Sequence, residues 1–320
     1  MTLNATGPIS LAGTTAGQSI EIELGGTGTT QISLNCTSVR TLAGVPSGAI
    51  IMPTNFYGKA NQFNYTISSN QTNFCMRAGA VSAGWDQSSK LAVTINSGVV
   101  LSANSTGVFG MYIQGSFPGG VSLTNNGTIV GVGGNGGGGG SANAYGGGGT
   151  NGATGAAAGP GLYIRSNITI CNASGVIAGG GGGGGGGASG YHCAGCCGCY
   201  YVGGGGAGGG RSSNVTNASG ASGGSAINNG SNFGSPGATG GAGTYSSQGS
   251  GGSGGNVRSV TFGGAGGSGG TWGALGGSGG TTSGTNANSS PGSGGAGGAA
   301  TCGTGYVTWT STGTRYGAIN

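Results

Sequence analysis

The sequence predicts a small β module at the N-terminus, a β-rich middle, and then a polyglycine II sandwich, with no substantial α-helix. Three observations support this fold class. Alternating polar and apolar runs occur in the first 130 residues. Most of the 89 glycines lie between residues 131 and 300, and short inserts with aromatic or cysteine residues separate the glycine tracts. The tracts are similar in length and lie at 133–140, 179–187, 203–210, 263–270 and 276–280.

Residues 1–62 are predicted to form a β module that attaches the chain to a larger assembly. Residues 19–24 and 31–35 alternate polar and apolar side chains, as half-buried strands do. The glycine-rich residues 25–28 lie between them and supply a turn, so a hairpin is expected.

The second half of this module is predicted to contain a short helix and a strand. Residues 38–44 end in glycine, which is typical of a helix C-terminus. Residues 47–53 read as a strand that leads into an aromatic and cationic stretch. We expect this stretch to take part in attachment through Phe56, Tyr57 and Lys59.

Residues 63–130 are predicted to form a β-rich connecting domain. A unit of apolar strand, Asn, Gly and a second apolar strand occurs at 93–100, at 123–130 and again at 168–177. Asn and Gly suit a tight turn between two short strands. Repetition of such a unit predicts stacked rungs, because stacking is how these units bury their apolar faces.

Residues 131–320 are predicted to form the sandwich of polyproline II helices, closed by a strand at 305–310. Glycine lacks a Cβ atom, so neighbouring main chains can approach closely. A polyproline II helix makes no internal hydrogen bonds, so its buried N–H and C=O groups must bond to neighbouring helices. A tract of nine residues spans about 28 Å. A stack of this kind needs a cap at its end, and the final strand is expected to supply it.

Two other structures fit such a composition less well. Collagen requires a strict glycine at every third position, and this chain lacks that period and has seven prolines. A disordered linker is the usual meaning of so much glycine, and ordering glycine carries a high entropic cost. The matched tract lengths and the aromatic inserts favour an ordered domain.

The charge pattern excludes several classes of protein. Only 3% of residues are charged, and the acidic ones are Glu21, Glu23 and Asp86. The chain has no basic cluster of the kind that binds nucleic acid. The N-terminus lacks a cationic segment followed by an apolar run, so no signal peptide is predicted. No apolar stretch is long enough to span a membrane. A chain made in a cytoplasm that works outside it, as in a released virion, fits these facts.

The residues needed for catalysis are scarce. The chain has one histidine, His192, and three carboxylates. Paired-carboxylate hydrolysis requires two acids across a cleft, and a histidine-assisted nucleophile requires an orienting acid. The glycine tracts are not followed by the Lys-Ser/Thr of a phosphate loop. We therefore predict neither an enzyme nor a cofactor.

A cysteine-rich insert lies between two glycine tracts, at residues 191–201. Its spacing resembles a metal site, but zinc sites normally join two separated pairs of ligands. A disulfide that pins an exposed loop is the preferred interpretation in an oxidising medium, and free or mixed thiols are the other alternative. No metal is predicted at the four cysteines, which are Cys193, Cys196, Cys197 and Cys199.

Aromatic residues in the inserts form the predicted binding surface. Loops rich in Tyr, Ser, Gly and Asn on a rigid frame bind partners as antibody paratopes do. The alternative is that these aromatic side chains cap the glycine stack internally. The candidate residues are Tyr145, Tyr191, His192, Tyr200, Tyr201, Phe233, Tyr245 and Trp272.

The segments 126–129 and 172–177, each of which runs into polyglycine, resemble the receptor-recognising adhesin at the tip of T-even-type phage long tail fibres. The resemblance covers roughly residues 90–310 in pattern. It implies a polyglycine II sandwich whose variable loops bind an outer-membrane protein or surface polysaccharide of the host. Residues 42–59 are instead similar to a module of other phage tail structural proteins, and the cysteine-rich insert departs from the adhesin pattern.

The resemblance implies a virion protein at the tail or fibre tip, held by other tail or fibre proteins, as a homotrimer or as a monomer on a trimeric fibre. The first hypothesis for its function is therefore a receptor-binding adhesin. The second is a structural or decoration protein of the phage tail or capsid, without receptor binding. An ice-binding protein is a third, because glycine bundles can present flat and regular faces.

Overall fold

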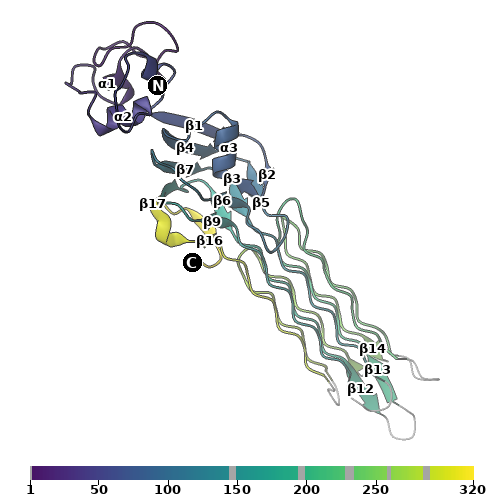
Figure 1. Ribbon diagram of the computed structural model, residues 1–320. Helices are drawn as coiled ribbons and strands as arrows, with labels where there is room; N and C mark the ends of the chain where they lie inside the picture. Colours follow the sequence, from purple (N-terminus) through teal and green to yellow (C-terminus); the bar gives the residue numbers. More distant parts are fainter. Residues whose placement is uncertain (1, 144–148, 194–198, 228–233, 258–260, 284–288) are drawn as a thin grey trace.

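The computed structural model is an elongated molecule with a compact module at one end, a β domain next to it, and a long array of extended segments (Figure 1). It describes residues 2–143, 149–193, 199–227, 234–257, 261–283 and 289–320. Among these residues, the helices are all far too short to cross a membrane. The chain is rich in β-strands and contains few helices, as predicted.

The N-terminal module contains two short helices, α1 (Ile20–Glu23) and α2 (Thr37–Ala43), and the 3-10 turn η1 (Thr54–Phe56). The helix predicted over 38–44 is confirmed by α2, which ends at Gly44 in the left-handed conformation with a φ of 70°. No strand is assigned between residues 2 and 61, so the β character predicted for this module is wrong.

The predicted hairpin fails because its first strand is a helical turn instead. The Ser19 hydroxyl accepts a hydrogen bond from the Ile22 amide and caps α1. The Glu21 carboxylate accepts from the amides of Thr27 and Gly28, and the Glu23 carboxylate accepts from the Asn61 amide at 2.9 Å. These carboxylates are buried, so the alternation of Glu and Ile does not mark a solvent-exposed face and a buried face.

The strand predicted over 47–53 is also absent, because this stretch bends into η1. Phe56 is completely buried in the core of the module, together with Leu3, Ile20 and Val39. The Tyr57 hydroxyl donates to the Gly7 carbonyl at 2.9 Å, and Lys59 is partly buried. Phe56 therefore holds the module together and offers no side-chain surface to a partner.

The β domain is a parallel solenoid whose rungs contribute to three sheets. The first sheet contains β1 (Gln62–Ile67), β4 (Lys90–Ile95), β7 (Val121–Asn125), β10 (Ile168–Cys171) and β17 (Val307–Ser311). The second contains β2 (Gln71–Thr72), β5 (Val100–Ser102), β8 (Thr128–Val130), β11 (Val176–Ala178) and β18 (Thr314–Tyr316). The third contains β3 (Phe74–Cys75), β6 (Met111–Ile113), β9 (Leu162–Ile164) and β16 (Thr301–Cys302), and α3 (Met76–Ser82) follows β3.

The predicted stacking of strand–turn–strand units is confirmed. The units are β4–β5, β7–β8 and β10–β11, and each pairs in parallel with the next. Alternate residues of the strands, such as Leu91 and Val93, are buried in one apolar core. Buried asparagines stabilise the turns, because the Asn125 side chain donates to Asn172 Oδ1 at 2.7 Å and the Asn172 side chain donates to the Thr312 carbonyl.

The C-terminal strand predicted at 305–310 is present as β17, but it does not cap the glycine region. It pairs with β10 as the last strand of the first sheet. Val307 and Trp309 pack on the solenoid core. The alternation in this strand therefore closes a sheet, and the glycine region is sealed by other residues.

The glycine region consists of two insertions between solenoid strands. The first lies between β8 and β9 (131–161), and the second lies between β11 and β16 (179–300). Its segments run back and forth beside one another and form a rod that projects from the solenoid (Figure 1), and we call this rod the glycine array. Two hairpins lie at the far end of the array, which we call the distal end. They are formed by β12 (Gly190–Cys193) with β13 (Cys199–Val202), and by β14 (Asn256–Val257) with β15 (Thr261–Phe262).

Main-chain hydrogen bonds between segments hold the array together. In the central segment, 179–188, successive N–H groups donate hydrogen bonds to three different neighbouring segments, and this pattern repeats every three residues. This is the repeat of a polyproline II helix. Gly180, Gly183 and Gly186 donate to carbonyl groups of segment 153–159. Gly181, Gly184 and Gly187 donate to segment 205–211, and Gly182, Gly185 and Ala188 donate to segment 274–280. All nine donor–acceptor distances lie between 2.8 and 3.1 Å.

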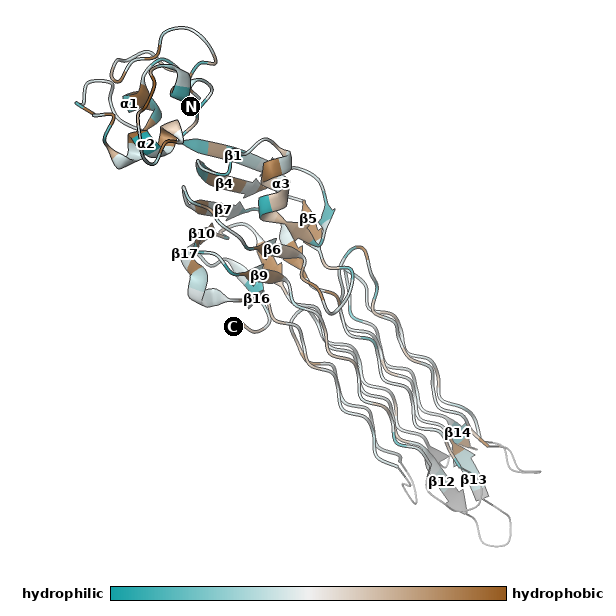
Figure 2. Ribbon diagram, viewed as in Figure 1, coloured by the Kyte–Doolittle hydropathy of each residue, from teal (hydrophilic) through white to brown (hydrophobic). Residues whose placement is uncertain are grey.

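Close contact on every side explains why the central segment is polyglycine. A Cβ atom on any residue from 179 to 187 would lie well under 3.0 Å from a carbonyl oxygen of a neighbouring segment. Segments at the surface admit one side chain in every three residues on their exposed face, as at Ser250, Ser253 and Asn256. The ribbon of the array is mostly close to white, the middle of the hydropathy scale, whereas brown apolar residues gather in the module and the solenoid (Figure 2). Main-chain hydrogen bonds, rather than apolar burial, therefore stabilise the array.

Candidate functional site

The hairpin β12–β13 continues the central segment of the array at the distal end (Figure 1). In its antiparallel register Tyr191 pairs with Tyr201, and His192 pairs with Tyr200. The rings of Tyr191 and Tyr201 stack, with centroids 6.1 Å apart and an angle of 21° between their planes. Tyr201 is 7% exposed, while Tyr191 and Tyr200 are partly exposed. Tyr201 thus anchors the hairpin, and Tyr191 and Tyr200 present aromatic surface.

Hydroxyl groups join neighbouring segments just below this hairpin. The Ser189 amide donates to the Ser289 hydroxyl at 2.8 Å, and the Ser289 hydroxyl donates back to the Ser189 carbonyl at 3.0 Å. The Ser141 amide donates to the Thr150 hydroxyl at 2.8 Å, and the Ser235 hydroxyl accepts from the Asn256 amide. These bonds fix the ends of the segments, so the loops between them start from a rigid base.

For several predicted loop residues the structure describes either nothing or only the strand they belong to. Tyr145, Phe233, Cys196 and Cys197 lie outside the described residues. His192, Cys193 and Cys199 are described only as parts of strands β12 and β13. The disulfide hypothesis for this insert stays a prediction. The cysteines with described side chains, Cys36, Cys75, Cys171 and Cys302, carry free thiols.

Trp272 and Tyr245 lie at the other end of the array, against the solenoid. Trp272 is 8% exposed and packs with Val130 and Ala178. Its indole N–H donates to the Ser212 carbonyl at 3.2 Å, and the centroid of the Tyr245 ring lies 5.2 Å from its own. These two candidates therefore do not share a surface with Tyr191, and the alternative of internal capping describes their positions.

Arg211 completes this cluster. Its guanidinium carbon lies 3.6 Å from the centre of the Trp272 ring, a short cation–π distance. Its Nε donates to the Tyr245 carbonyl at 2.8 Å. The cluster of Arg211, Tyr245 and Trp272 closes the end of the array that the C-terminal strand was expected to cap.

A signal in the sequence could have separated the two kinds of insert. Because the segments run back and forth, successive inserts alternate between the two ends of the array. The inserts after residues 188 and 256 lie at the distal end of the array, whereas the inserts after residues 211, 244 and 271 lie at the end next to the solenoid. Counting inserts from β11 therefore assigns Trp272 and Tyr245 to the solenoid end.

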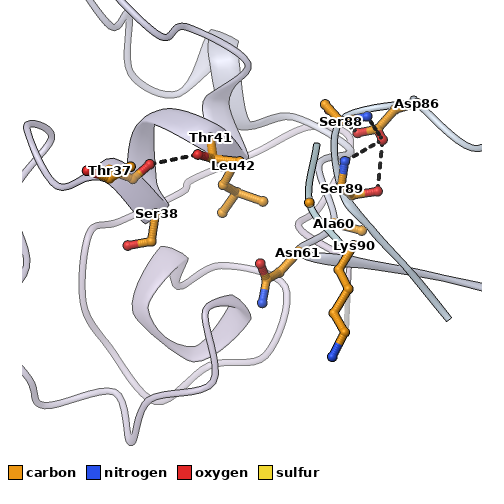
Figure 3. Close-up of a pocket in the computed structure, with 11 residues that line it drawn as sticks. Thr37, Ser38, Thr41, Leu42, Ala60, Asn61, Asp86, Ser88, Ser89 and Lys90 are labelled. Atoms are coloured by element: carbon orange, nitrogen blue, oxygen red, sulfur yellow. Dashed lines mark hydrogen bonds between the residues drawn. The ribbon is translucent and has the colours of Figure 1, made fainter. Parts of the chain in front are cut away.

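A polar pocket of about 310 Å³ lies between the N-terminal module and the solenoid (Figure 3). Helix α2 contributes Thr37 and Thr41, and the loop before β4 contributes Asp86 and Ser89. Burial alone would raise the pKa of Asp86, but hydrogen bonds from Ser89 and Ser88 reverse this, so its pKa lies below the ordinary value. Lys90 is the other charged residue of the described lining (Figure 3), and no second carboxylate lines the pocket with Asp86.

The described residues also contain no group of three or more potential metal ligands among His, Cys, Asp and Glu.

Comparisons with known proteins find one similar family model and one similar solved structure. Residues 62–200 match the model of a protein family described as phage tail fibre adhesin Gp38. The crystal structure of the gp37-gp38 adhesin tip complex of the bacteriophage S16 long tail fiber is similar, with a TM-score of 0.50 and 20% sequence identity. The similarity covers 97% of this chain and 100% of that chain. No curated protein matches. The resemblance to phage tail fibre adhesins is thus confirmed.

Proposed function

Because residues 62–200 match a family of phage tail fibre adhesins, we propose that this chain binds a host receptor through the distal end of its glycine array. The position of the β12–β13 hairpin supports this proposal. It stands at the end of a rod that points away from the N-terminal module (Figure 1). Tyr191 and Tyr200 provide partly exposed aromatic surface there, on a base fixed by main-chain and hydroxyl hydrogen bonds.

We also propose that the array is a polyglycine II sandwich. The three-residue rotation of hydrogen bonds in segment 179–188 supports this assignment, because it matches a helix with three residues per turn. The absence of hydrogen bonds within that segment supports it further. A rod of this kind positions loops without an apolar core.

The N-terminal module is proposed to dock the chain to another protein of the tail fibre, which places it on the virion. The similar crystal structure is a complex of gp38 with gp37, which makes a fibre protein the natural partner. The module lies opposite the distal end (Figure 1) and exposes 61% of Ile51. In this proposal the chain is non-enzymatic, and its receptor is an outer-membrane protein or a surface polysaccharide.

Adsorption of phage particles to their native host tests the receptor proposal. Phages carrying Tyr191→Ala or Tyr200→Ala are compared with phages carrying Tyr306→Ala. Tyr306 is the matched control, because it is 46% exposed but lies on the solenoid. We expect adsorption to fall by about tenfold or more for the distal variants, the effect of losing one aromatic contact of 1.4 kcal/mol or more. Unchanged adsorption with normal particle assembly would refute a distal receptor site.

The copy number of the chain in purified particles separates this proposal from a structural or decoration role. An adhesin at the tip of a fibre is present in a few copies per virion, whereas a decoration protein is present in hundreds. Quantitative mass spectrometry of particles, with a capsid protein as the internal reference, gives this number directly.

A further inference from the structure

The outer face of the third solenoid sheet carries aromatic residues. Met111 and Ile113 of β6, and Leu162 and Ile164 of β9, point into the core and are completely buried. The residues between them therefore point outward. The parallel register aligns Cys75, Tyr112, Tyr163 and Cys302 in one row across this face.

Three rings on this face pack against one another and form an aromatic cluster of Phe109, Tyr112 and Tyr163. The ring centroid of Phe109 lies 4.7 Å from that of Tyr163 and 5.5 Å from that of Tyr112. The Tyr112 hydroxyl accepts a hydrogen bond from the Phe109 amide at 3.0 Å. These rings are only partly buried, so the cluster is an ordered aromatic surface that faces solvent.

An open hollow of about 520 Å³ lies next to this row, and two arginines line it together with Gln114. The guanidinium carbon of Arg165 lies 5.4 Å from the centre of the Tyr163 ring. Arg77 is held from two sides, because its Nε donates to the Ser116 carbonyl at 3.3 Å and its Nη2 donates to the Gln87 side chain. These bonds use two of its five N–H groups and leave three for a ligand.

Gly115 makes room for the stem of Arg77. Its φ of +104° lies in the region that favours glycine. A Cβ atom at this position would lie 2.8 Å from Cδ of Arg77 and would push the side chain aside. The two hydrogen bonds of Arg77, for which Gly115 leaves space, therefore hold its guanidinium group at the hollow without a ligand.

Neither arginine has a counter-charge among the residues that the structure describes. The chain contains only three acidic residues, and none of them forms an ion pair with Arg77 or Arg165 in the described part of the chain. The Asp86 carboxylate accepts hydrogen bonds from Ser88 and Ser89 instead. In a chain with 3% charged residues, two unpaired guanidinium groups in one hollow are a concentration of positive charge that suits an anion.

We propose that this hollow binds a phosphate group of a cell-surface saccharide. Guanidinium groups match the geometry of phosphate oxygens, the Gln114 amide adds donors, and the aromatic cluster offers a flat surface to a sugar ring. The choice of a saccharide rests on the proposed function. The array holds the solenoid about 30 Å behind the distal end, so only molecules that project that far from a cell surface reach the hollow.

Binding of purified full-length chain to phosphorylated mannan tests the proposal without cells or receptor. Neutral mannan of the same length and inorganic phosphate are the reference ligands. Arg165→Gln is compared with Lys90→Gln, because both remove one positive charge and Lys90 is an exposed residue outside the hollow. We expect about tenfold weaker binding of phosphorylated mannan to Arg165→Gln, since the variant loses a charge-assisted hydrogen bond to the phosphate. Binding to Lys90→Gln should equal that of the native chain.

Three results would overturn the proposal. Equal weakening in both variants would show attraction to net charge only. Equal binding of neutral mannan would remove the role of phosphate, and equally tight binding of inorganic phosphate would remove the role of the sugar. Because the assay contains no receptor, its failure leaves the distal site untouched, and failure of the adsorption test leaves this assay valid.

Discussion

A Cβ atom on Gly183 would overlap the carbonyl oxygen of Asn135, which belongs to a different segment of the glycine array. The Gly183 amide also donates to the Ala156 carbonyl at 2.9 Å. Glycine at this position is therefore required by the distance between main chains and not by a positive φ, since Gly183 has none. The same is true along the whole central segment.

Replacement of Gly183 by Ala should lower the free energy of unfolding by about 1–3 kcal/mol, the usual cost of overpacking. Gly138→Ala is the matched control, because the nearest atom to its Cβ position is 4.0 Å away. That control should be neutral or stabilising by about 0.4–1 kcal/mol, since alanine restricts the unfolded chain. Denaturant unfolding of both variants measures the difference. Equal stabilities would contradict close packing at Gly183.

Trp272→Ala should destabilise the junction between the array and the solenoid by about 3–5 kcal/mol, as for other buried tryptophans. The loss includes the contact with Arg211 and the hydrogen bond to Ser212. Tyr306→Ala, at a residue that is 46% exposed, serves as the control and should change stability little. If Trp272→Ala kept native stability yet reduced adsorption of phage, Trp272 would be a receptor residue after all.

Stability of the N-terminal module should fall in acid through Glu21. Burial alone would raise its pKa, but hydrogen bonds from Thr30, Gly28 and Thr27 outweigh this and hold the pKa below the ordinary value. A carboxyl whose pKa is depressed in the folded state stabilises that state above the unfolded pKa of about 4.3, and this contribution is lost as pH falls through the folded pKa. Thermal unfolding from pH 6 to pH 3 measures the loss. The Glu21→Gln variant should show a weaker pH dependence, and an identical profile would contradict this role.

The four cysteines with described side chains should react with iodoacetamide at different rates. Burial raises the pKa of the Cys302 thiol, which lowers its thiolate fraction at neutral pH, whereas Cys36 is exposed. Mass spectrometry of the alkylated native protein should find Cys36 modified first. Modification of Cys302 at the same rate would contradict its burial. The same experiment reports whether Cys193 and Cys199 are available as thiols.

The solenoid could be predicted from the sequence because its signals are local. Strands β4, β7 and β10 alternate in polarity, and Asn and Gly mark the turn after each. The N-terminal module could not, because its structure depends on contacts between distant residues. The Glu23 carboxylate, for example, binds the amide of Asn61. A strand pattern of only six residues does not show that its carboxylates are buried.

The candidate site could be predicted only in part, for a topological reason. Aromatic inserts at the two ends of the array have the same composition, and only the direction of each segment separates Tyr191 from Trp272. The surface segments also carry a period of three residues, as in Ala265, Ser268 and Thr271, which marks their exposed face. This period is hidden in the central segment, where every side is enclosed.

Hydrogen–deuterium exchange of the amides in segment 179–188 tests whether the glycine array is a hydrogen-bonded rod. Every amide in this segment donates to a neighbouring segment of the chain. We predict exchange as slow as in strand β4 of the solenoid core, with Gly183 as well protected as Val93. Exchange at the rate of an unstructured glycine peptide would show that the rod that carries the distal hairpin does not exist.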